Sequence, residues 1–127
     1  SMQQVVLLIE DDKMIQRLLS RMIKRSGFDG KVEVFDNSDA VFQFIAQCSD
    51  TIVIAFMDTS IHPEGDEALG YALKAQVPNI KLVASSGHSE DDLRGPDHFG
   101  TLDLDGVLSK PFGMQDVKEL LSTLNLS

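Results

Sequence analysis

The chain has 127 residues, which is enough for one domain with a buried core. Hydrophobic residues make up 43% and charged residues 24%, as in an ordinary soluble globular protein. The net charge of −9 argues against nucleic-acid binding or contact with an anionic membrane by this domain. Cys48 is the only cysteine, which excludes an intrachain disulfide and a cysteine-based zinc site. With no run of about 18 apolar residues, a cytoplasmic location is expected.

One domain is expected over residues 4–127, with residues 1–3 as an extension. Ser1 before Met2 is typical of a residue left by cleavage of an expression tag. No internal repeat, low-complexity tract or linker divides the rest.

Five short apolar runs predict β-strands. The run over residues 52–58 is unbroken until Asp58, as in a strand buried on both faces of a parallel sheet. The run over 32–35 alternates, which indicates a half-exposed edge strand. The predicted strands cover residues 5–9, 32–35, 52–58, 80–85 and 106–109.

Helical periodicity separates these strands. Asp12 is a candidate N-cap for the first helix, and Gly27 ends it. A helix over about 67–76 carries Tyr71, which we expect to be a half-buried packing residue. The segment 89–101 is acidic and contains glycine and proline, so at most a short helix is expected there. The predicted core-facing residues of the helices are Met14, Ile15, Leu18, Leu19, Met22, Ile23, Val41, Phe44, Ile45, Cys48, Leu69, Ala72, Leu73, Val117, Leu120, Leu121 and Leu124.

Strand and helix alternate five times, which predicts a parallel α/β sheet with right-handed crossovers and helices on both faces. Functional groups in such sheets lie beyond the carboxyl ends of the strands. Four of the five predicted strands end in a carboxylate, hydroxyl or ammonium group. These residues are Glu10, Asp11, Asp58, Ser85, Ser86 and Lys110.

Carboxylates that converge at one edge repel each other unless a cation neutralises them. Magnesium prefers oxygen ligands, a few carboxylates and a phosphate. Asp58 could then attack phosphorus, while the Lys110 ammonium and the Ser86 hydroxyl contact phosphoryl oxygens. The product would be an aspartyl phosphate, which suits a switch.

These motifs resemble the response-regulator receiver domain of two-component phosphorelay signalling. The matching segments are Leu8-Ile9-Glu10-Asp11-Asp12, Phe56-Met57-Asp58, Ala84-Ser85-Ser86-Gly87 and Leu108-Ser109-Lys110-Pro111-Phe112. The resemblance covers nearly the whole chain. It implies a flavodoxin-like, doubly wound, five-stranded parallel sheet of order 2-1-3-4-5 with five helices, the fourth short or irregular.

The resemblance also implies roles for the site residues. Asp58 would be the phosphoacceptor, and the metal, Mg²⁺ or Mn²⁺, would bind Asp58 and Asp11 directly, Glu10 through water, and the backbone carbonyl of Ser60. Ser86 would be the switch hydroxyl and Lys110 the lysine that contacts the phosphate, with a cis peptide at Lys110-Pro111. The domain would catalyse its own phosphorylation and dephosphorylation.

Several positions depart from the family pattern. The family often has an aromatic residue three places before the lysine, where this chain has Val107. Pro63 comes one residue later than usual after the acceptor. Ser60 and His88 occupy positions that tune phosphate lifetime in the family. His62, His88 and His98 are expected to be solvated loop residues.

Two other functions remain open. A magnesium phosphohydrolase of the haloacid-dehalogenase type would need an acid two residues after Asp58, where Ser60 stands. A receiver fold could also serve as a phosphorylation-independent interaction module. A Gly-rich P-loop is absent from the sequence.

The implied partner is a sensor histidine kinase or a histidine phosphotransfer protein, and homodimerisation is open. The source could be a stand-alone regulator or part of a larger one. It could also be a hybrid sensor histidine kinase, because the sequences of residues 83–88 and 105–112 resemble the receiver domains of such kinases most.

Overall fold

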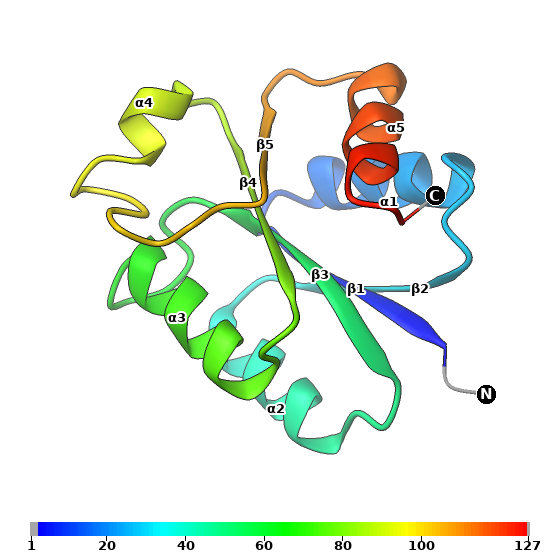
Figure 1. Ribbon diagram of the computed structural model, residues 1–127, viewed down its shortest axis with the longest axis horizontal. Helices are drawn as coiled ribbons and strands as arrows, with labels where there is room; N and C mark the ends of the chain where they lie inside the picture. Colours follow the sequence, from blue (N-terminus) through cyan, green and yellow to red (C-terminus); the bar gives the residue numbers. More distant parts are fainter. Residues whose placement is uncertain (1–2, 127) are drawn as a thin grey trace.

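A computed structural model describes residues 3–126 as five strands that alternate with five helices (Figure 1). Residues 1 and 2 of the predicted extension, and Ser127, lie outside the described residues. The elements are β1 (Gln4–Ile9), α1 (Lys13–Arg25), β2 (Gly30–Phe35), α2 (Ser38–Gln47), β3 (Thr51–Asp58), α3 (Asp66–Gln76), β4 (Lys81–Ser86), α4 (Glu90–Leu93), β5 (Gly106–Ser109) and α5 (Met114–Thr123).

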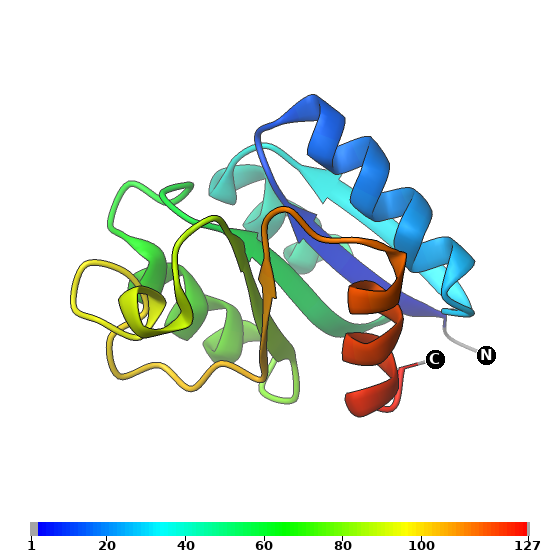
Figure 2. The ribbon, with the colours of Figure 1, turned by 90° about the horizontal axis from the view of Figure 1, so that it is seen from above.

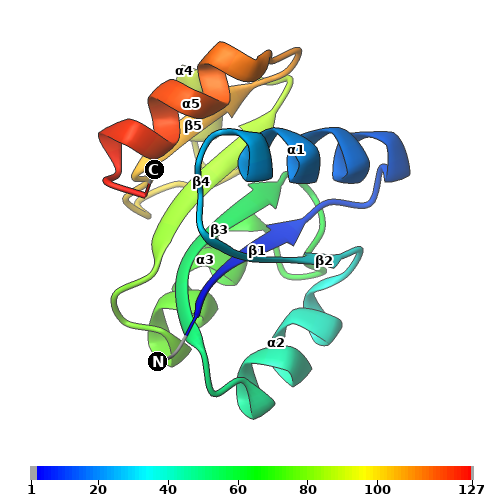
Figure 3. The ribbon, with the colours of Figure 1, turned by 90° about the vertical axis from the view of Figure 1, so that its right-hand side faces the viewer.

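The five strands form one parallel sheet of order β2-β1-β3-β4-β5. Helices α1 and α5 cover one face, and α2 and α3 cover the other (Figures 2 and 3). The predicted fold class, strand order and edge position of β2 are confirmed. Strand order reverses at β1 and β3, so the crevice beyond their carboxyl ends is where such folds bind ligands.

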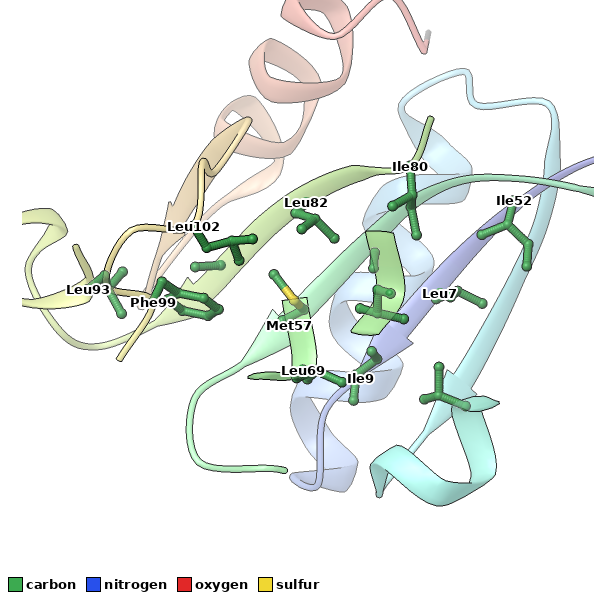
Figure 4. Packing of buried hydrophobic residues seen from close by; sticks show 14 of the residues in the cluster. Leu7, Ile9, Ile52, Met57, Leu69, Ile80, Leu82, Leu93, Phe99 and Leu102 are labelled. Carbon is green, nitrogen blue, oxygen red and sulfur yellow. The ribbon is translucent and has the colours of Figure 1, made fainter. Parts of the chain in front are cut away.

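Side chains that alternate along the central strands divide the core into two clusters. Val6, Leu8 and Phe56 pack with α1 and α5 on one face. Leu7, Ile9 and Met57 pack on the opposite face with residues of α3 and the segment after α4 (Figure 4). Burial on both faces explains why β1, β3 and β4 are almost continuously apolar in sequence.

Helix α1 buries a narrower face than its apolar stripe predicts. Leu19 and Ile23 are fully buried, whereas Met14 is 69% and Leu18 40% exposed. Asp12 is the N-cap as predicted, because its carboxylate accepts hydrogen bonds from the backbone N–H groups of Met14 and Ile15 at 2.9 and 3.2 Å.

The fourth helix is a single turn, as predicted, and the segment after it packs against α3. Leu93, Phe99 and Leu102 are buried in the cluster on the α3 side of the sheet (Figure 4). Gly70 of α3 leaves the space that Leu102 occupies, since a Cβ there would overlap the Leu102 side chain. Segment 94–105 therefore belongs to the core despite having no regular structure.

Tyr71 is half-buried, as expected. Its side chain is 49% exposed, and its hydroxyl bonds to the Thr101 hydroxyl at 3.0 Å. Thr101 lies in the α4–β5 segment, so this segment contacts Tyr71 on α3. Among residues 3–126, no helix is long and apolar enough to cross a membrane.

Candidate functional site

The register of the sheet brings the strand ends together. Ile9 lies beside Met57 where β1 pairs with β3, so Glu10 and Asp58 follow at the same level. Asp58 lies beside Ser85 in β4, and Ser86 lies beside Ser109 in β5, immediately before Lys110. Groups from four separate stretches of the chain therefore meet at the carboxyl edge of the sheet.

Three carboxylates form a cluster at this edge. Glu10, Asp11 and Asp58 each offer an oxygen within 4.8 Å of the others. Glu10 is buried, the Asp58 side chain is 14% exposed, and Asp11 faces solvent. Hard divalent cations prefer this arrangement of oxygen ligands, partly inside the protein and open on one side.

Lys110 bridges the two less exposed carboxylates. Its Nζ donates to Glu10 Oε1 at 2.8 Å and to Asp58 Oδ1 at 3.1 Å. The Lys110-Pro111 peptide bond is cis, as the resemblance implied. One ammonium among three carboxylates leaves an excess of negative charge that a cation would neutralise.

Burial and pairing affect the two charged partners differently. Burial raises the pKa of Glu10, and its repulsion with Asp58 adds to this, which outweighs the hydrogen bonds from Lys110 and the Asp12 N–H. Burial lowers the pKa of Lys110, but its bonds to Glu10 and Asp58 outweigh that, and the net shift is upward. The difference fits the geometry, because the Glu10 side chain is 2% exposed and that of Lys110 24%.

Ser86 supplies a buried hydroxyl beside the acidic cluster. It is 1% exposed, and its Oγ accepts a hydrogen bond from the His88 N–H at 3.1 Å. The Thr59 hydroxyl lies 3.5 Å from it. The preceding Ser85 hydroxyl is buried and has no hydrogen-bond partner within residues 3–126. Sequence reasoning did not select Thr59, although its place directly after Asp58 could have suggested it.

Ser60 adopts a left-handed backbone conformation in the loop after β3, with φ of 68°. Its N–H donates to Asp66 Oδ1 at 2.7 Å, and His98 Nδ1 lies 2.8 Å from Asp66 Oδ2. Asp66 is 3% exposed, and sequence reasoning missed it. An aspartate at the start of α3 looks like an ordinary helix-terminal acid, so no local signal shows this contact.

Two of the three histidines are not solvated, contrary to the sequence-based expectation. The side chains of His62 and His98 are 17% and 14% exposed. His62 Nδ1 lies 2.7 Å from the buried Ser38 hydroxyl. The rings of His88 and His98 contact each other, with centroids 4.4 Å apart.

No aromatic ring occupies the position three residues before Lys110. Val107 is partly buried there and packs against the core cluster on the α3 side. Phe99, the aromatic residue closest before it in sequence, is fully buried in the same cluster. The side chain at residue 107 is therefore a small aliphatic one that packs against the core.

Comparison with protein families matches residues 6–122 to the response regulator receiver domain. The match spans most of the chain, so this protein belongs to the response regulator receiver domain family. A comparison with curated proteins gives no match.

Solved structures share the fold. A response regulator from Thermotoga maritima superposes with a TM-score of 0.81 at 17% identity, covering 99% of this chain and 100% of that one. A sensor protein from Polaromonas sp. JS666 gives a TM-score of 0.76 at 20% identity, covering 98% of each chain. The Mn²⁺-bound form of response regulator Rcp1 gives 0.70 at 21% identity, covering 97% of this chain and 94% of that one.

Proposed function

We propose that this domain accepts a phosphoryl group from a phosphohistidine onto Asp58 in a Mg²⁺-dependent reaction and switches conformation in response. One observation carries the proposal: Lys110 bridges Asp58 and the buried Glu10 at the edge where the acidic cluster forms. A lysine that only balanced surface charge would not need a half-buried position between two carboxylates.

In this reaction an Asp58 carboxylate oxygen attacks phosphorus as the phosphorus–nitrogen bond to the donor breaks. The electron pair of that bond returns to the imidazole, which takes up a proton. Lys110 holds Asp58 Oδ1 at 3.1 Å, so Oδ2 is the oxygen that we propose to attack. Holding the carboxylate in one orientation supplies the positioning on which phosphoryl transfer depends.

The metal would be held by the Asp11 and Asp58 carboxylates and the Ser60 carbonyl, with Glu10 acting through water. The three carboxylates, within 4.8 Å of one another, fit the oxygen-ligand preference of Mg²⁺ or Mn²⁺. When bound, the ion would neutralise charge on the phosphoryl oxygens.

Lys110 and Ser86 would contact the new phosphoryl group. The ammonium is already at the acceptor carboxylate, and we propose that it bonds a phosphoryl oxygen after transfer. The Ser86 hydroxyl would donate to another oxygen. Because the His88 N–H bonds to Ser86 Oγ, movement of this hydroxyl would pull the loop after β4.

The donor would be a sensor histidine kinase or a histidine phosphotransfer protein, acting in the cytoplasm. Similarity to a solved sensor protein over nearly the full length of both chains supports a hybrid sensor kinase as the source. A solved response regulator shares the fold over its full length, and a stand-alone regulator is the alternative source.

Phosphoramidate tests the reaction, because its phosphorus–nitrogen bond resembles that of phosphohistidine. Intact-mass spectrometry should show one added phosphoryl group when Mg²⁺ is present and none after chelation. Asp58→Asn should abolish the addition. Asp12→Asn is the matched control, since it removes the same charge nearby, and Asn caps a helix as well as Asp does. Labelling that survives Asp58→Asn would refute the proposal.

Beryllofluoride separates a phosphoacceptor from an interaction module. A phosphoacceptor should bind it with Mg²⁺ and show NMR shift changes near Ser86 that Asp58→Asn removes. An unmutated protein without any response would favour the interaction module. Steady release of inorganic phosphate from small phosphate esters would instead favour a phosphohydrolase.

A further inference from the structure

The loop that contains Ser60 is tied to a distant part of the chain through a buried carboxylate. Asp66 accepts the Ser60 N–H through Oδ1 at 2.7 Å and bonds His98 Nδ1 through Oδ2 at 2.8 Å. His98 lies in the segment between α4 and β5, more than thirty residues beyond Asp66. Both carboxylate oxygens of Asp66 therefore have a partner, which a buried charge requires.

Ser60 needs this support because of its backbone conformation. A φ of 68° is unfavourable for any residue with a Cβ. Such a conformation persists only where surrounding contacts fix it. The bond from the Ser60 N–H to Asp66 is a contact of that kind: it holds the Thr59–Ser60 peptide in place, and the Ser60 carbonyl belongs to the peptide that follows.

His98 in turn is fixed by its surroundings. Its side chain is 14% exposed, and its backbone carbonyl accepts the Glu67 N–H at 3.1 Å. Phe99, the next residue, is fully buried in the core. The imidazole is therefore held in place by the docked α4–β5 segment and can orient Asp66.

We infer that Asp66 and His98 are positioning residues for the metal site: Asp66 holds Ser60 in its left-handed conformation, and His98 holds Asp66. This inference rests on the proposed function, in which the Ser60 carbonyl is a metal ligand. It makes the α4–β5 segment a support of the metal site, although none of its residues is among the proposed ligands.

The contact between the His88 and His98 rings links His98 to the loop after β4, which follows Ser86. The His88 N–H bonds to Ser86 Oγ, and its ring lies 4.4 Å from that of His98, centroid to centroid. The loops after β3 and β4 thus meet at His98. Metal binding at the loop after β3 and phosphate contact at the loop after β4 would therefore both affect His98.

Two conservative substitutions separate hydrogen bonding from packing. The amide nitrogen of Asn lies close to the Nδ1 position of histidine, whereas the amide nitrogen of Gln lies close to Nε2. His98→Asn therefore keeps a donor for Asp66 Oδ2, and His98→Gln moves it away. His98→Leu removes the donor altogether. His88→Leu is the matched control, because His88 contacts the same ring but not Asp66.

Binding of Mn²⁺ to the whole chain is measured by EPR of the free ion, and urea unfolding verifies that each variant is folded. Loss of groups that orient metal ligands typically weakens binding 10-fold or more, so we expect about 10-fold weaker binding for His98→Gln and His98→Leu. His98→Asn and His88→Leu should stay within about 2-fold of the unmutated protein, since the Asp66 contact remains.

Equal Mn²⁺ affinity in the unmutated protein and both donor-deficient variants would overturn the inference. So would an Asn variant as weak as the Leu variant, because packing would then be the cause. If His98→Leu does not fold, the Asn and Gln variants decide the question. Failure of the proposed function differs from these outcomes: the unmutated protein would bind no Mn²⁺ and take up no phosphoryl group from phosphoramidate.

Discussion

Replacing Asp11 with Asn should stabilise the metal-free protein. Glu10, Asp11 and Asp58 lie with oxygens within 4.8 Å of one another, and Lys110 pairs with Glu10 and Asp58. Asp11 is the exposed member of the three, so its removal leaves no buried group without a partner. Its charge repels two neighbours, and the single ammonium offsets only part of that repulsion.

The size of the effect follows from Coulomb's law. The carboxylate oxygens lie within 4.8 Å of one another, and two unit charges at that limit repel by about 0.9 kcal/mol in a water-like medium. Asp11 is repelled by Glu10 and Asp58 and attracted by Lys110, so removing its charge should stabilise the folded state by about 1 kcal/mol at low salt. The gain should be smaller at high salt, because ions screen exposed charges. For a domain of this size, about 1 kcal/mol raises the melting temperature by about 4 °C.

Added magnesium should reverse which protein is more stable, the unmutated one or the Asp11→Asn variant. The unmutated protein gains about 2.7 kcal/mol at a Mg²⁺ concentration of 100 times Kd, because the ion binds only the folded state. The Asp11→Asn variant lacks one charged ligand and should gain much less. The variant is therefore expected to be the more stable protein in EDTA and the less stable one in Mg²⁺.

Urea unfolding, monitored by circular dichroism, measures the stability of both proteins in EDTA and in Mg²⁺. Asp12→Asn is the control for the loss of charge alone. A variant less stable than the unmutated protein in EDTA would show that the three acids do not repel each other as described. Equal stabilisation of both proteins by Mg²⁺ would remove Asp11 from the metal site.

Four further changes test the packing and electrostatics by urea unfolding. Phe99→Ala should cost about 3–5 kcal/mol, because Phe99 is fully buried; a loss below about 1 kcal/mol would mean that the α4–β5 segment is not part of the core. Gly70→Ala should cost about 1–3 kcal/mol, since its Cβ would overlap Leu102, and a neutral result would contradict this packing. Asp12→Ala should cost about 1 kcal/mol through loss of the α1 cap, whereas Asp12→Asn should be near neutral. Burial raises the pKa of Glu10, so without metal the folded state loses stability as this carboxyl ionises. The Glu10→Gln variant should therefore gain stability relative to the unmutated protein as the pH rises from about 4 to 7. A difference in unfolding free energy that does not change with pH would refute this prediction.

The sequence predicts most of the fold because its signals are local and repeated. Continuous apolar runs such as residues 52–57 are what a doubly covered strand requires, and the crossover rule then orders the elements. The convergence of Glu10, Asp58, Ser86 and Lys110 is predictable for the same reason, because each follows a strand and parallel strands end at one edge.

Contacts made by irregular segments are not predictable in this way. His98 reaches Asp66 only because Leu93, Phe99 and Leu102 dock a loop that has no periodicity. The same docking brings the Thr101 hydroxyl to within 3.0 Å of the Tyr71 hydroxyl. These positions depend on tertiary packing alone, which local patterns do not encode.

The shortness of β5 bears on how the protein avoids aggregation. β5 is an outer strand, and the outer side of such a strand can recruit the backbone of another chain. Here it has only four residues, and Pro111, which has no N–H to donate, follows soon after them. At the opposite margin, β2 carries Lys31 and Glu33, whose charges disfavour stacking of identical chains. Both margins of the sheet are thus poor templates for growth into fibrils.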